Sequence, residues 1–135
     1  MDLAILIISL IRSGIKMATP LVMTSIGEIF AERSGVINIG LEGMMLTGAL
    51  GGMLGSYFTG SPWIGLLVGM GAGFLLAGLF SLVTVYLGSD QVVMGAALNL
   101  LALGLTGVFY RQIFGITGTA LTVQTFEPID IPLID

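Results

Sequence analysis

Apolar residues run along this chain in long blocks that are separated by short polar or glycine-containing breaks. Four blocks are long enough to cross a bilayer as α-helices, because about 20 apolar residues span the hydrocarbon core. They occupy residues 15–31, 36–59, 63–88 and 91–111. The breaks between the later blocks carry turn-forming glycine, proline and polar residues. The pattern predicts an all-α integral membrane protein with about four transmembrane helices.

A further, amphipathic helix is predicted over residues 1–14, ahead of the first block. Its polar side chains recur at intervals of three and four and share one narrow face with the next basic residue: Asp2, Ser9, Arg12, Ser13 and Lys16. This stripe either lies among the lipid headgroups or lines a polar passage; the first is favoured because long basic side chains are common near membrane surfaces. Pro20 then bends the chain or marks the first turn of a new helix.

Residues 32–45 interrupt the apolar pattern with Arg33, Asn38 and Glu42, set among several small residues. Beyond Glu42 no charged residue follows until Asp90. Polar side chains among membrane helices are costly unless protein or water surrounds them. This polar interruption is therefore the first candidate for a functional site.

Two interpretations of the polar interruption stay open from the residues alone. If the chain is helical from about Ile37, Asn38 and Glu42 share a face. In the structural interpretation, which is marginally favoured, Asn38 caps the following helix, Glu42 sits in its first turn and Arg33 is an interfacial counter-charge. In the functional interpretation, Asn38 and Glu42 line a polar pathway through a broken helix, as in many transporters.

Small residues recur at every fourth position in the second and third blocks. The glycines at these positions are Gly48, Gly52, Gly65, Gly69 and Gly73. This spacing lets helix backbones approach closely in lipid, so it predicts that the two helices pack tightly together. Asn99 lies in the middle of the fourth block, where a side-chain amide needs a hydrogen-bonding partner. Residues 112–135 contain two prolines and three acids and predict an extended aqueous segment.

Composition agrees with a membrane protein and excludes several kinds of chemistry. Of the 135 residues, 56% are hydrophobic and 9% charged, whereas a soluble domain carries about 25% charged residues. There is no Cys and no His, which excludes disulfides, the usual zinc sites and the commonest general base, so no metal site is predicted. The net charge of −4 argues against nucleic-acid binding.

The sequence carries no phosphate-binding loop for ATP. Its one lysine, Lys16, is followed by Met17 rather than by Ser or Thr. Any ATP hydrolysis must therefore take place on another subunit. The first residues lack the basic region of a cleavable signal peptide, and the few basic residues do not set the orientation in the membrane.

Two segments resemble a known family. Residues 30–45, which read FAERSGVINIGLEGMM, and residues 90–100, which read DQVVMGAALNL, are similar to the permease subunit of bacterial ATP-binding-cassette (ABC) importers. The superfamily is that of the branched-chain amino acid and ribose permeases, and the similarity is closest to the branch for simple sugars and nucleosides that works with basic-membrane-protein-type binding lipoproteins. The resemblance runs from about residue 15 to the end.

The resemblance implies part of a type II ABC importer permease fold in the bacterial cytoplasmic (inner) membrane. It also implies a second permease subunit, two cytoplasmic ATPase subunits that hold ATP and Mg, and an extracytoplasmic substrate-binding lipoprotein; no cofactor is expected in this chain. The turns at Arg33 and Asp90 would face the cytoplasm, and residues 112–135 would form an extracytoplasmic loop. Because family members are longer, the chain is expected to be the N-terminal half, either a fragment or a truncated gene product.

With the resemblance, the functional interpretation of the polar interruption is preferred. Asn38, Glu42 and Asn99 are predicted to border the translocation path for a nucleoside or simple sugar. One alternative is a permease for a branched-chain amino acid or another small solute. Another is a carrier or channel subunit that is driven by an ion gradient and depends on titration of Glu28 or Glu42. A third is a structural membrane subunit, which would tolerate changes at Asn38 and Glu42.

Overall fold

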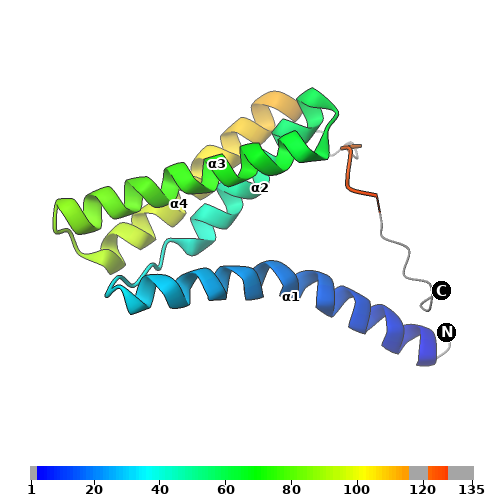
Figure 1. Cartoon of the computed structure of the whole chain (residues 1–135). Helices are drawn as coiled ribbons and strands as arrows, with labels where there is room; N and C mark the ends of the chain where they lie inside the picture. Colours follow the sequence, from blue (N-terminus) through cyan, green and yellow to red (C-terminus); the bar gives the residue numbers. More distant parts are fainter. Residues whose placement is uncertain (1–2, 116–121, 128–135) are drawn as a thin grey trace.

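The computed structural model describes residues 3–115 and 122–127. Within these ranges the chain forms four α-helices and one π-helical turn: α1 (Leu3–Arg33), α2 (Leu41–Thr59), α3 (Pro62–Ser81), η1 (Leu82–Tyr86) and α4 (Gln91–Phe114). Helices α2, α3 and α4 lie side by side, whereas α1 is joined to them at one end and diverges towards its N-terminus (Figure 1). The predicted all-α class is confirmed.

Helix α1 is one continuous element, whereas the sequence predicted a break between residues 14 and 15. It runs for 31 residues with Pro20 inside it and with no buried residue. Gly14 alone does not end it, because a glycine inside a helix costs only about 1 kcal/mol relative to alanine. A proline is tolerated in a membrane helix when neighbouring groups satisfy the freed backbone. That residues 1–14 lie among headgroups stays a prediction, and Asp2 lies outside the described residues.

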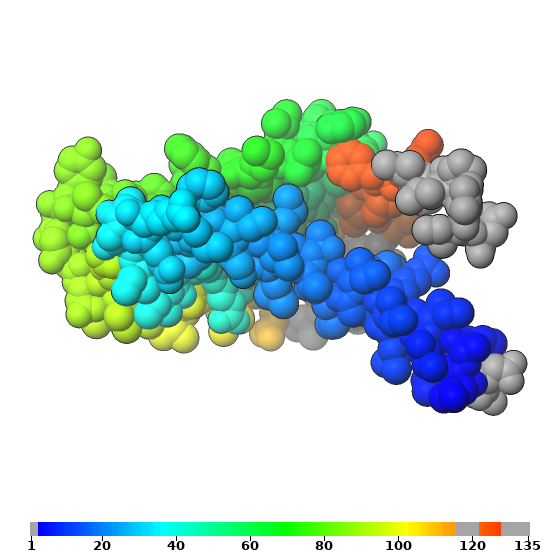
Figure 2. Space-filling view, turned by 60° about the horizontal axis from the view of Figure 1, so that its bottom comes forward, coloured from blue at the N-terminus to red at the C-terminus, as the bar shows by residue number. Residues whose placement is uncertain are grey.

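The N-terminal part of α1 projects beyond the remaining helices (Figure 2). At a rise of about 1.5 Å per residue, α1 is longer than the hydrocarbon core requires. A helix of this length would span with a tilt, or one of its ends would leave the core. Large apolar side chains are exposed along it, Met17 and Met23 among them, and such exposure costs little against lipid.

The second predicted helix begins later than expected, at Leu41 instead of residue 36. The cause is Gly35, whose φ of +84° ends the helical path of α1 and leaves residues 36–40 without helical hydrogen bonding. The last helix is longer than expected, because α4 continues to Phe114. Of the predicted aqueous segment 112–135, residues 122–127 are non-helical. Residues 116–121 and 128–135 lie outside the described ranges.

Three of the described helical stretches are long and apolar enough to cross a membrane: Leu3–Arg33, Pro62–Tyr86 and Gln91–Phe114. Helix α2, which the sequence counted as a fourth span, is not among them. Its 19 residues include Glu42 and several glycines, which lower its hydropathy. It lies against α3 along its length, and Gly43, Gly51, Gly55 and Ser56 of α2 are buried.

The interface between α2 and α3 is built on glycine backbones, at the positions predicted to pack. An added Cβ at Gly65 would lie 2.7 Å from the carbonyl oxygen of Gly52, and one at Gly69 would lie 2.8 Å from that of Gly48. At Gly73 the nearest atom would be 3.7 Å away, so the helices are further apart there. The backbones therefore touch over the middle of the pair.

Two more glycines of α2, outside the predicted ridge, also lie against α3. A Cβ at Gly51 would meet that of Ala72 at 2.9 Å, and one at Gly55 would meet that of Val68 at 2.9 Å. In the sequence these two glycines are also four residues apart, and each lies one position before a residue of the predicted ridge, Gly52 or Ser56. The contact surface of α2 is therefore wider than one stripe.

Candidate functional site

The polar interruption forms a non-helical link, residues 34–40, which is called the α1–α2 connection below. At its start, the amide of Gly35 donates to the carbonyl of Glu32 at 2.9 Å, and that of Val36 donates to Ala31 at 3.1 Å. These bonds close the last turn of α1 in the manner of a glycine C-cap. The connection ends at Gly40, the N-cap residue of α2.

Asn38 shapes the connection from within. Its Oδ1 accepts a hydrogen bond from the amide of Gly40 at 3.0 Å, which is an Asx-type turn. Asn38 therefore precedes the N-cap position by two residues and does not cap α2 as the structural interpretation expected. Its Nδ2 lies 3.3 Å from the sulfur of Met44, a weak acceptor, so the side chain of this half-buried residue points towards α2.

Glu28 ties α1 to the connection. Its Oε1 accepts a hydrogen bond from the amide of Asn38 at 2.8 Å. Its other carboxylate oxygen, Oε2, is buried and has no hydrogen-bond partner within the described residues. A carboxylate in this position is a strong acceptor for a backbone amide that has left helical geometry. Glu28 was named from the sequence only as one of two acids on which a gradient-driven carrier would depend, and not as a partner of the connection.

Asn99, in the middle of α4, holds the beginning of α2 from the other side. Its Oδ1 accepts from the amide of Gly43 at 2.7 Å, and its Nδ2 donates to the carbonyl of Ile39 at 3.0 Å. The amide of Gly43 is one of the first N–H groups of α2, which have no partner inside the helix. The N-cap residue of α2, Gly40, has no side chain that could cap the helix. The side chain of Asn99 therefore caps α2 from a different helix.

Gly95 and Gln91, one and two turns before Asn99 on α4, also contact the α1–α2 connection. The Oε1 of Gln91 accepts from the amide of Ile37 at 2.7 Å. Gly95 lies against the connection so closely that an added Cβ would be 2.9 Å from the amide nitrogen of Gly40. Gln91, Gly95 and Asn99 follow one another at four-residue spacing, so they share one face of α4. That spacing was visible in the sequence but was not used.

The structure brings two of the three predicted path residues together. Asn38 and Asn99 meet at the α1–α2 connection, and their hydrogen bonds go mostly to backbone groups. Glu42 lies in the first turn of α2 and is exposed; its carboxylate makes no side-chain hydrogen bond within residues 3–115 and 122–127. An acid suits this turn because it faces the positive end of the helix dipole.

The two predicted turn residues lie at one end of the helices. Arg33 is exposed in the last turn of α1. Asp90 caps α4, because its Oδ1 accepts from the amides of Val92 at 2.8 Å and Val93 at 3.0 Å. The α1–α2 connection and the turn before α4 are adjacent in space, as the bond between Ile37 and Gln91 requires (Figure 1).

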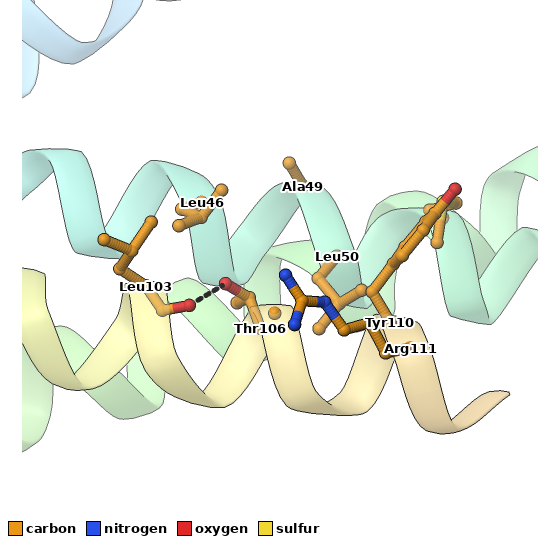
Figure 3. A pocket seen from close by; sticks show the side chains of 9 residues that line it. Leu46, Ala49, Leu50, Leu103, Thr106, Tyr110 and Arg111 are labelled. Atoms are coloured by element: carbon orange, nitrogen blue, oxygen red, sulfur yellow. Dashed lines mark hydrogen bonds between the residues drawn. The ribbon is translucent and has the colours of Figure 1, made fainter. Parts of the chain in front are cut away.

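A separate groove of about 410 Å³ lies between α2 and α4 (Figure 3). Leu46, Leu50 and Leu103 line it, and the side chain of Arg111 lies along it. The Thr106 hydroxyl, which also lines the groove, donates back to the carbonyl of Ala102 at 2.6 Å. The groove therefore offers mainly apolar surface.

Comparison with known families decides which class of protein this is. Residues 10–130 match the family described as branched-chain amino acid transport system / permease component. The chain belongs to this permease family. The resemblance found in residues 30–45 and 90–100 is thereby confirmed.

Curated relatives carry more specific names. The chain is 36% identical to the guanosine ABC transporter permease protein NupQ of Bacillus subtilis, over 98% of the chain and 43% of that protein. It is 42% identical to the nucleoside ABC transporter permease protein NupC of Lactococcus lactis, over 87% of the chain and 38% of the relative. It is 43% identical to the putative glucose ABC transporter permease protein TsgC13 of Haloferax volcanii, over 74% of the chain and 30% of that protein.

The chain therefore spans less than half the length of each of these relatives. No solved structure matches it significantly. The family that it belongs to is described as a permease component of a transport system.

Proposed function

We propose that this chain supplies the first helices of the permease subunit of an ABC importer in the bacterial cytoplasmic membrane, and that the solute is a nucleoside or a simple sugar. Family membership over residues 10–130 is the observation that carries the proposal. The names of the relatives, two nucleoside permeases and one putative glucose permease, support the substrate class. A branched-chain amino acid is the alternative solute that the family description suggests.

The translocation path is proposed to pass beside the α1–α2 connection. Irregular backbone at membrane depth is tolerated where protein or a water-filled cavity surrounds it, and this connection is held by side chains of α1 and α4. Asn38 and Asn99 act as positioning residues, since their amides are engaged with backbone groups. The exposed carboxylate of Glu42 is the group most available to a passing polar solute.

The energy is proposed to come from elsewhere in the transporter. The chain has no phosphate-binding loop, so ATP and Mg would be held by two cytoplasmic ATPase subunits. A second permease subunit would complete the path, and an extracytoplasmic binding lipoprotein would deliver the solute. The α1–α2 connection and the turn before α4, which are adjacent in space, would then face the cytoplasm, as the family resemblance implies.

Uptake assays test the proposal in cells that produce the transporter containing this chain. Labelled nucleoside, glucose and branched-chain amino acid are compared as solutes, with Glu42→Gln and Asn99→Ala as variants and Gly71→Ala as a control at an uncrowded position. Glu42→Gln should lower uptake about tenfold at an unchanged level in the membrane, since charge-assisted hydrogen bonds exceed neutral ones by about 1 kcal/mol or more. Normal uptake in both variants removes the proposed path.

A gradient-driven carrier is the second candidate, and the buried Oε2 of Glu28 is the observation that favours it. Ionisable side chains inside membrane segments commonly mark the ion pathways of carriers. A protonophore separates the two candidates when cellular ATP is maintained. Uptake that stops with the gradient, and that Glu28→Gln abolishes, establishes the carrier and contradicts the ABC importer.

A further inference from the structure

Residues 122–127 reach back to the helices at the end opposite the α1–α2 connection (Figures 1 and 2). The hydroxyl of Ser56, near the end of α2, donates to the backbone carbonyl of Gln124 at 2.6 Å. Phe126 meets the ring of Trp63, in the first turn of α3, edge to face with 5.0 Å between the centroids. The segment therefore holds both sides of the turn that joins α2 to α3.

Ser56 behaves differently from the other hydroxyl residues of the chain. Every other serine or threonine hydroxyl that makes a hydrogen bond within the described ranges donates to a carbonyl three or four residues before it. This local bond is the usual choice of a helical hydroxyl. Ser56 is only 5% exposed and reaches a residue 68 positions away. The contact with Gln124 is thus a specific tertiary bond.

The segment also forms one wall of a groove of about 390 Å³ that runs along the glycine backbones of α2 and α3. Gly52 and Gly65 lie on its floor, and Val123 and Phe126 belong to its wall. The docked segment therefore covers part of this groove.

The attachment is sparse. Residues 122–127 have no regular secondary structure, and all but Val123 are exposed. Among residues 3–115 and 122–127, one hydrogen bond and one aromatic pair are the specific contacts that hold this segment. Segments with few buried contacts open at far lower cost than packed helices.

We propose that residues 122–127 act as a releasable clasp. Docked, the clasp braces the α2–α3 turn and closes one end of the glycine-floored groove; released, it opens that end to water. The clasp moves as one unit, so loss of either contact weakens the other. The proposal rests on these contacts and not on the proposed transport function.

Spin labelling tests the clasp directly in the full chain, reconstituted in lipid nanodiscs. Because the chain has no cysteine, Thr59→Cys and Thr125→Cys place one nitroxide on α2 and one on the clasp without removing either contact. In this background the two labels should show strong dipolar coupling. Ser56→Ala and Phe126→Ala should each raise the weakly coupled, released population about five- to tenfold, as expected when one contact of this kind is lost.

Two controls sharpen the result. Thr47→Ala removes an α2 hydroxyl that bonds within its own helix, and Gln124→Ala keeps the backbone carbonyl that accepts from Ser56; both should leave the coupling unchanged. Phe126 is exposed, so its variant keeps the proposal testable if Ser56→Ala fails to fold. Equal coupling in the parent, Phe126→Ala and Ser56→Ala overturns the clasp, as does a parent that is already weakly coupled. Either result leaves the proposed function untouched, since no transport is measured.

Discussion

Replacing Gly69 by alanine should separate α2 from α3, because the new methyl group would meet only backbone. It would lie 2.8 Å from the carbonyl oxygen of Gly48 and 3.2 Å from two backbone atoms of Gly52. No side chain can rotate away to make room, so the two helices must move apart. Gly71, on the same helix, has no atom within 4 Å of an added Cβ and provides the matched control.

The size of the effect follows from that geometry. Relieving the contact with Gly48 requires a shift of about 0.5 Å, and a gap of this size forfeits about a quarter of the dispersion energy of each contact at the interface. Overpacking of a close interface costs about 1–3 kcal/mol. Alanine returns up to about 1 kcal/mol of helix propensity at both positions, so Gly69→Ala should be less stable than Gly71→Ala by about 2 kcal/mol.

Unfolding by titration with sodium dodecyl sulfate in mild detergent measures this difference. Far-UV circular dichroism reports helix content, and the fluorescence of Trp63, the one tryptophan of the chain, reports the first turn of α3. The midpoint of Gly69→Ala should fall below that of the parent, while that of Gly71→Ala should equal or exceed it. If the two variants unfold at the same point, backbone contact between α2 and α3 does not stabilise the protein and the reasoning is refuted.

Three further predictions concern the α4 face and the turn before it, and the same titration measures each of them. Asn99→Ala leaves the amide of Gly43 and the carbonyl of Ile39 without their side-chain partner and should cost about 1–3 kcal/mol; an unchanged midpoint would contradict the capping role. Gly95→Ala should destabilise the protein, because the new Cβ would lie 2.9 Å from the amide nitrogen of Gly40 in the connection. Gly104→Ala, whose Cβ would meet no atom within 4 Å, is the control and should not destabilise it. Identical unfolding midpoints for the two variants would rule out the close approach at Gly95. Asp90→Ala removes the oxygen that accepts from the amides of Val92 and Val93 and should cost about 1 kcal/mol. Asp90→Asn should cost much less, because asparagine is an equally good N-cap residue. A neutral Asp90→Ala would show that the cap is dispensable.

Some features of the candidate site could be predicted from the sequence and others could not. The polar interruption was visible because Asn38 and Glu42 stand between apolar blocks, and Asn99 was visible because a lone amide in a membrane helix needs a partner. Which partner it has was not visible, since the amide of Gly43 lies 56 residues away. The part of Glu28 was missed as well, because its contact depends on where the chain turns at Gly35.

The boundaries of the elements show the same division. The chain was expected to be helical from residue 36, but the positive φ of Gly35 and the turn at Asn38 delay α2 to Leu41. A break was expected before residue 15, yet α1 is continuous. Local propensities are weak compared with backbone hydrogen bonding in an apolar stretch, so they place the ends of helices poorly.

The order of apolar and polar residues alone determined that this chain is a helical membrane protein, because hydropathy and length require no knowledge of neighbours. Its motifs likewise identified the permease family, which residues 10–130 confirm. Only the tertiary structure decided which glycines carry backbone contact, which amide caps α2 and where Ser56 sends its hydrogen bond. These choices depend on atoms brought together from distant parts of the chain, and a linear pattern does not contain those distances.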